Sequence, residues 1–224
     1  EVILAHPLRT KAIASAKIKN DRVDSEILAH LLRTNLIPQS YIPPREIRDL
    51  RELLRYRVGL IRFQTIMKNR IHAILSKNGL IFPFSNIFSN KGIKWLQSLG
   101  LRKVYQDEIC GYIHIYESLN LQIKEAENEI SKQAQLNDEV QLLMSMPGIG
   151  EFSALLIYSE IGDIHRFPTA EKLCSYSGLV PSVRSSGDRI KMGSITKQGS
   201  ICLRWILVEL ACHFVNSSER FKTY

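Results

Sequence analysis

The chain has 224 residues, of which 45% are apolar, and can form one sizeable core or two small ones; its formal charge of +8 suits a polyanionic partner such as nucleic acid. Its four cysteines are far apart and form no Cys-x-x-Cys pair, which argues against a zinc site or a disulfide framework and for a reducing cytoplasm. No apolar run approaches the roughly 20 residues of a membrane span, and no signal peptide is visible.

Residues 1–44 predict a short α/β fragment. Val2–Ala5 is an apolar, strand-like run, and a lone strand cannot satisfy its own backbone groups. We therefore expect its sheet partners upstream, in a longer protein. A helix is expected from about Asp21 to Thr34, where apolar residues recur at helical spacing, and three prolines between residues 38 and 44 mark an extended link.

Residues 45–140 predict two long helices. The first, 45–78, is unbroken by proline and carries a dense set of arginines, which form either a solvated face with helical ion pairs or a face that tracks a nucleic-acid backbone. The second runs from about Val104 to Leu136. It has an approximate coiled-coil seam, which could pack within the chain or dimerise. The seam residues are Ile109, Ile113, Tyr116, Ile123 and Ile130.

Residues 141–224 predict a compact helical domain that begins with a helix, a tight turn and a second helix. The turn is Pro147-Gly148-Ile149-Gly150, and this arrangement is typical of the helix-hairpin-helix of many DNA-binding proteins. Glycines let backbone amides point outward, and the second helix begins with its positive dipole end at the turn. We expect Gly148 and Gly150 to contact phosphate; the alternative is a simple helix connection.

A basic, glycine-punctuated segment follows. We expect Gly178–Pro181 to end the regular structure and expose a loop, Ser182–Gly193, that contains Ser185 and Ser186. A serine hydroxyl needs activation to act as a nucleophile, and nearby cations would stabilise a phosphorane-like transition state. The alternative is an ordinary polar turn. The cations of this loop are Arg184, Arg189 and Lys191.

Two further positions suggest ion binding. Lys197 and Arg204 lie near the first turns of a helix expected over Ser200–Val215, where an anion could bind. Asp21 and Asp24 are three residues apart on one helical face, the spacing at which two carboxylates can help hold Mg²⁺. The alternative is that Asn20 or Asp21 caps the helix and that Asp24 is an acidic residue favoured in its first turn, and two carboxylates fall short of a complete two-metal site.

Taken in order, the motifs resemble the Piv-like DEDD transposases of bacterial and archaeal insertion sequences, also called bridge-RNA-guided recombinases. The resemblance covers nearly the whole chain. The motifs that carry it are Lys19–Ser25, Leu50–Leu53, Arg55-x-Arg57, Lys68–His72, Pro147–Gly150, Glu160–Asp163, Gly178–Pro181, Ser186-Gly187 and Ile195-Thr196-Lys197-x-Gly199.

The resemblance implies a RuvC-like, RNase H-fold domain with an Asp-Glu-Asp-Asp set for Mg²⁺, then a coiled coil, then a transposase domain with a nucleophilic serine. Asp21 and Asp24 would be the last two acids of the set. Ser186 would be the nucleophile, with Ser185 as the second candidate. The family's first two acids lie upstream of Val2, so this fragment alone is expected to be inactive. The expected DNA contacts are Gly148, Gly150, Arg184, Lys197 and Arg204.

The expected fold is therefore mainly α: a RuvC-like remnant over 1–44, a coiled-coil region over 45–140 and a transposase domain over 141–224. The expected partners are DNA, a guide RNA and further copies of the chain through the coiled-coil helices, with no membrane. Two other functions remain open. One is a non-catalytic helix-hairpin-helix module that binds DNA or RNA, and the other is a RuvC-like nuclease that uses water.

Overall fold

The computed structural model describes residues 2–13, 20–186 and 189–217, without the side chains of 184–190 and 217. The chain divides into two compact units, Glu1–Arg45 and Glu46–Tyr224. It is mainly helical, as expected. The helices are α1 (Pro7–Ile13), α2 (Asp21–Arg33), α3 (Arg45–Lys77), α4 (Asn90–Gln97), α5 (Lys103–Gln135), α6 (Asp138–Met144), α7 (Glu151–Ile161), the 3₁₀ turn η1 (Ile164–Arg166), α8 (Ala170–Ser177) and α9 (Ile201–Ser217); the strands are β1 (Pro181–Ser186) and β2 (Arg189–Ile195).

The first unit has little core of its own. The strand predicted for Val2–Ala5 is wrong, since this segment makes only a single bridge, between Ala5 and Gln39. Among the described residues, no neighbouring strand pairs with the rest of the segment. Leu31 is the one buried residue of α2. Apolar side chains from the N-terminal segment and α2 line an open pocket instead. Its lining residues are Ile3, Leu4, Ala5, Leu28, Ala29, Leu32 and Ile37.

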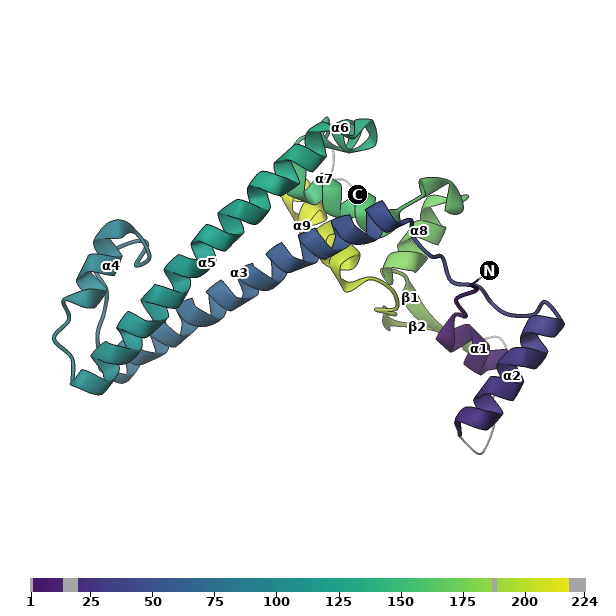
Figure 1. Ribbon diagram of the computed structural model, residues 1–224, viewed down its shortest axis with the longest axis horizontal. Coiled ribbons are helices and arrows are strands. Elements are labelled where there is room, and N and C mark those ends of the chain that lie inside the picture. The colour runs from purple at the N-terminus through teal and green to yellow at the C-terminus, as the bar shows by residue number, and fades with distance from the viewer. Residues whose placement is uncertain (1, 14–19, 187–188, 218–224) are drawn as a thin grey trace. The chain divides into compact units, whose positions relative to one another are not determined.

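In the second unit, α3 and α5 form a long antiparallel hairpin, and Figure 1 shows them close together near α4 and spreading apart toward α7 and α9. Arg57 pairs with Glu127, while Lys68 lies over the ring of Tyr116, so residue numbers rise on one helix as they fall on the other. At the tip, α4 and its flanking loops close a small core around Ile71, Leu75, Leu96, Ile109 and Ile113.

The seam predicted on the long second helix packs within the chain. All five of its residues are buried, from Ile109 at the hairpin tip to Ile130 at the other end. Ile130 belongs to the larger core, together with Leu54 of α3 and residues of α6, α7 and α9. These seam residues are therefore not available to pair with a second copy, and the dimerisation alternative for the seam is wrong.

The C-terminal helices pack around α7. Ala154–Ile157 are buried, because the sequence of α7 is apolar on every side and α5, α6 and α9 all contact it. The expected helix, turn and helix are present as α6, residues 145–150 and α7. Among the described residues, no helix is both long and apolar enough to cross a bilayer.

The loop predicted for Ser182–Gly193 is wrong, because β1 and β2 form an antiparallel hairpin there. A register shift lies between Pro181 and Val183, at the end of the hairpin where Pro181 pairs with Ile195. The sequence Gly187-Asp188 between the strands suits a two-residue hairpin turn, and this signal could have predicted the hairpin.

Candidate functional site

The candidate serines lie at the far end of the β-hairpin. Ser185 pairs with Ile190, and Ser186 pairs with Arg189 as the last residue of β1. Arg184 pairs with Lys191, so basic residues occur on both strands close to the serines. The side chains of 184–190 lie outside the described part of the chain. The backbone therefore places Ser186 at the hairpin tip, and the roles of Ser185, Ser186 and Arg184 stay predictions.

The foot of the hairpin is packed tightly against the end of α8. The amide of Thr196 donates to the carbonyl of Val180 at 2.9 Å, and the amide of Lys197 donates to the carbonyl of Gly178 at 3.1 Å. Gly199 has φ +101°, and a Cβ there would overlap the carbonyl oxygen of Tyr176. Only glycine fits this position, which gives a structural reason for the glycine that ends the Ile195–Gly199 motif.

Lys197 and Arg204 lie together at this foot. Lys197 is exposed and has a left-handed backbone with φ 55°. Arg204 is half-buried, and its Nη1 donates to the carbonyl of Ser177 at 3.1 Å. Ser200 caps α9 by accepting from the amide of Leu203 at 3.1 Å.

Ser186 is separated from these cations along the hairpin. It lies five residues from Pro181 at the foot, about 17 Å at the usual rise of a strand. A single phosphate at Ser186 would thus be far from Lys197 and Arg204 of the same chain. These two residues could contact a different phosphate of the same DNA.

The two glycines of the turn between α6 and α7 have different surroundings. Gly148 has φ +90°, and a Cβ there would overlap the imidazole ring of His213 on α9, so this glycine serves helix packing. Gly150 is the N-cap residue of α7 and is exposed, and a Cβ there would meet nothing within 4 Å. Its side of the turn is therefore open to a phosphate.

Asp21 and Asp24 are both exposed in the first turn of α2. The N-cap is Asn20, whose side chain accepts from the amide of Val23 at 2.8 Å, and both aspartates lie where acidic residues favour a helix, in agreement with the capping alternative. Mg²⁺ usually takes one or two carboxylates together with substrate phosphates, and this pair fits such a role. Within the described residues, no three acidic, histidine or cysteine side chains come together as a metal site.

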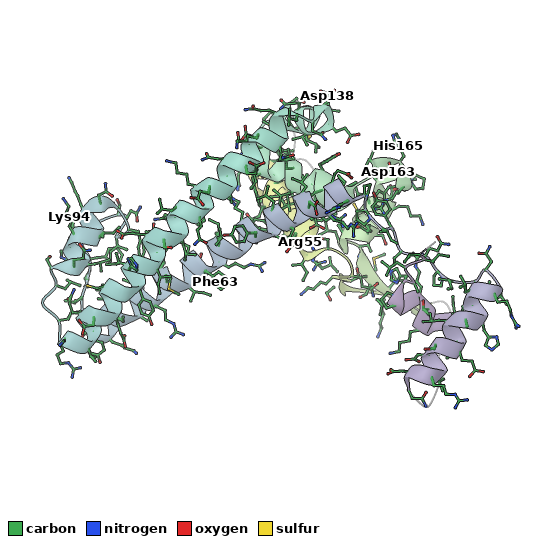
Figure 2. All side chains as sticks on the ribbon, in the orientation of Figure 1. Arg55, Phe63, Lys94, Asp138, Asp163 and His165 are labelled. Carbon is green, nitrogen blue, oxygen red and sulfur yellow. The ribbon has the colours of Figure 1, made fainter. Side chains whose placement is uncertain are left out.

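One polar cluster was missed by the sequence reasoning. Glu160 of α7 is 1% exposed, and both its carboxylate oxygens accept hydrogen bonds from Arg55 of α3, at 2.7 to 3.1 Å. Figure 2 labels Arg55, whose side chain is 46% exposed. Although burial by itself lowers the pKa of Arg55, its hydrogen bonds to Glu160 and the negative charge of that residue raise the pKa above its ordinary value.

A signal for this cluster existed in the sequence. Glu160 is the one charged residue between Phe152 and Ile161, in a helix that is otherwise nearly all apolar. Such a helix is buried, and a buried carboxylate needs a cation. The signal predicts that a partner exists, but it does not say which of the many arginines it is.

Comparison with known proteins matches both ends of the chain to transposases. Residues 140–224 match the model of the transposase IS116/IS110/IS902 family. Residues 1–79 match a transposase model of the DEDD type from IS110 elements.

Individual relatives agree with these two matches. A putative transposase, y4qE of Sinorhizobium fredii, is 28% identical over 94% of this chain and 52% of its own length. The transposases for insertion sequence elements IS1111A of Coxiella burnetii and IS1328 of Yersinia enterocolitica are each 27% identical over 90% of this chain, and over 57% and 60% of their own lengths. The chain thus spans little more than half the length of these relatives.

Proposed function

The chain belongs to the IS116/IS110/IS902 family of insertion-sequence transposases, and we propose that the protein containing it cuts and rejoins DNA through the hydroxyl of Ser186. The observation that carries this proposal is the position of Ser186 at the tip of a basic β-hairpin. A hairpin tip can enter the groove of a duplex and bring a hydroxyl to a phosphate. A serine in a core helix could not do so.

The proposed reaction is a transesterification. The Oγ of Ser186 attacks a DNA phosphorus, a phosphoserine bond forms, and the bond from that phosphorus to the leaving strand breaks. The hydroxyl proton ends on the oxygen of the leaving strand. Because one phosphoester replaces another, a different strand end can reverse the step without ATP. The cations at Arg184, Arg189 and Lys191 would stabilise the extra negative charge of the transition state.

Asp21 and Asp24 are proposed to hold Mg²⁺ with two acids supplied by the part of the protein outside this chain. The metal would supply Lewis-acid stabilisation of the phosphate oxygens. The two carboxylates share the exposed first turn of α2, while Asn20 caps the helix through its own side chain. The RuvC-like identity of the first unit belongs to this part of the proposal.

DNA is proposed to contact the exposed side of the turn at Gly150 and the hairpin foot at Lys197 and Arg204. A guide RNA is proposed to lie along α3. This helix carries nine arginines and lysines against three acidic residues, and no acidic residue follows Glu52 in it. The partner helix α5 has three lysines and six acidic residues, so α3 is the basic side of the hairpin.

Self-association of the long helices is also proposed, but through faces other than the seam. Phe63 of α3 is 57% exposed and offers an apolar surface for such a contact. Figure 2 labels Phe63 on the part of α3 that lies beyond Arg55.

A non-catalytic nucleic-acid-binding protein is the second candidate. The basic α3 and the open turn at Gly150 favour it, since both can bind phosphate without chemistry. A nuclease that uses water would need Asp21 and Asp24 but not Ser186.

Covalent trapping separates these functions. The full-length transposase would be incubated with Mg²⁺, guide RNA and labelled donor DNA and analysed on a denaturing gel. We expect a protein-linked DNA band that disappears in Ser186→Ala and persists in the matched control Ser185→Ala. Cleaved DNA without a linked band would indicate the nuclease, and binding without cleavage would indicate the binding protein. Loss of the band in Ser185→Ala alone would move the nucleophile to Ser185.

A further inference from the structure

Two other helices are fixed to the last turn of α7. Arg51 of α3 donates Nε to the carbonyl of Ser159 at 2.6 Å and Nη2 to the carbonyl of Glu160 at 2.9 Å. The hydroxyl of Tyr176, on α8, donates to the same Glu160 carbonyl at 3.3 Å. A helix leaves its last four carbonyls without partners inside the helix, and a cation is favourable at that end. Arg51 supplies both the hydrogen bonds and the charge.

The other two carbonyls of this turn are satisfied by neighbours in sequence. The amide of Gly162 donates to the carbonyl of Tyr158 at 2.8 Å, and Nη2 of Arg166 donates to the carbonyl of Ile161 at 2.9 Å. All four C-terminal carbonyls of α7 are therefore bonded. Side chains of α3, η1 and α8 therefore all bond to the end of this helix.

The same contacts continue from α8 to the foot of the hairpin. The hydroxyl of Tyr176 bonds to α7. The backbone carbonyl of the same residue packs so closely against Gly199 that no side chain would fit there. Gly178, directly after α8, accepts the amide of Lys197 and packs against the backbone of Gln198. A shift of the α7 end would therefore move α8, the 196–200 loop and the hairpin that begins at Pro181.

We propose that Arg51 and Arg55 are positioning residues that set the place of the Ser186 hairpin relative to α3. Arg51 holds the backbone of the last turn of α7, and Arg55 holds the side chain of Glu160 in that turn. Arginine suits position 51 because two N–H groups of its planar guanidinium bond to two carbonyls at once, which the single ammonium of lysine does not do in the same geometry. The inference rests on the proposed serine reaction, because it assigns these arginines to the geometry of that step.

The test uses full-length transposase with Arg51→Gln, Arg51→Lys and Glu160→Gln. The matched control is Glu127→Gln, which weakens the ion pair between Arg57 and Glu127, at 2.6 Å, away from the end of α7. We expect the first three variants to slow the formation of the serine–DNA bond at saturating DNA by on the order of 10- to 100-fold, since a misplacement of about 1 Å has such effects. The DNA concentration for half-maximal rate should stay within about twofold, because the contacts of DNA with the protein are unchanged.

Lysine distinguishes positioning from stability. Arg51→Lys keeps the charge at the helix end but loses the second hydrogen bond of the guanidinium. Its melting temperature should therefore be close to that of the wild type, while its rate of serine–DNA bond formation should stay low. Wild-type rates in Arg51→Gln would overturn the proposal. So would a full recovery of rate and melting temperature together in Arg51→Lys, which indicates a purely structural role.

Hydrogen exchange on the 224-residue chain gives a readout that does not depend on the reaction. In Arg51→Gln the amides at the hairpin foot, Leu179, Thr196 and Lys197, should exchange faster, and those of α4 at the hairpin tip should not. Unchanged exchange at the foot would refute the inference. If wild-type protein forms no DNA link, the proposed function fails, and faster exchange confined to the foot would still support the contact pathway from Arg51.

Discussion

The two halves of α3 both carry several cations but use them in different ways. In the first half, Arg51, Arg55 and Arg57 all bond to acceptors on α5 or α7. In the second half, the side chains of Arg62 and Arg70 have no hydrogen bond or ion pair with any described residue. The difference arises from what each half faces: the first half packs on a helix with a buried carboxylate, and the outer side of the second faces solvent. Arginine density alone therefore does not separate structural cations from those available to a ligand.

The largest expected effect is at Arg55. Arg55→Gln leaves Glu160, which is 1% exposed, without its charge partner. The free energy of unfolding should fall by about 3 kcal/mol, at the lower end for a broken buried pair because Arg55 is half exposed. Urea denaturation of the 224-residue chain measures this. A loss under about 1 kcal/mol would mean that water or another cation compensates Glu160, and the distinction between the two halves would weaken.

A smaller effect is expected two residues further along α3, at the pair between Arg57 and Glu127 of α5. Their side chains are 21% and 48% exposed, so water screens the pair. Glu127→Gln should lower the free energy of unfolding by about 0.5 kcal/mol in the same denaturation experiment. A loss as large as that of Arg55→Gln would show that burial of the carboxylate is not what separates these two ion pairs.

The smallest effect on stability is expected in the second half of α3. The double variant Arg62→Gln, Arg70→Gln should change the free energy of unfolding by less than about 0.5 kcal/mol, because neither side chain has a described partner. Its affinity for labelled single-stranded RNA should nevertheless fall, and the slope of log affinity against log salt should decrease by about 1.4, the value for two lost phosphate contacts.

The control for this effect removes two exposed lysines from the acid-rich helix α5. Lys103→Gln with Lys124→Gln changes the net charge by the same amount as the α3 double variant. Equal losses of RNA affinity in both variants would mean that only the overall charge matters. The proposal of a specific basic face on α3 would then be wrong.

The sequence predicted the helices well because their signals are local. Apolar spacing and proline positions predicted helices over 21–34, 45–78 and 104–136, and the structure has them within about a residue at each end. The strand at Val2–Ala5 and the loop at Ser182–Gly193 were wrong. A strand needs a partner that local pattern does not supply, and the few alternating apolar residues around Gly187-Asp188 gave a weak hairpin signal.

The candidate site divides in the same way. Motif order and spacing singled out Ser186, the Asp21 and Asp24 pair and the turn at Gly150. The backbone places Ser186 at the end of β1, and the other three residues are exposed. The motifs treated Gly148 and Gly150 alike. Packing against His213 gave one of them a structural role.

The sequence by itself determined the bounds of the three longest expected helices, the basic character of α3 and the order of motifs that marks a transposase, but it did not predict α1. Periodicity, charge and motif spacing all act between near neighbours in the chain, so they can be read without a fold. The tertiary structure decided which arginines hold the protein together. Arg55 and Glu160 are 105 residues apart, and a buried carboxylate selects its partner only when packing brings two helices together and excludes water.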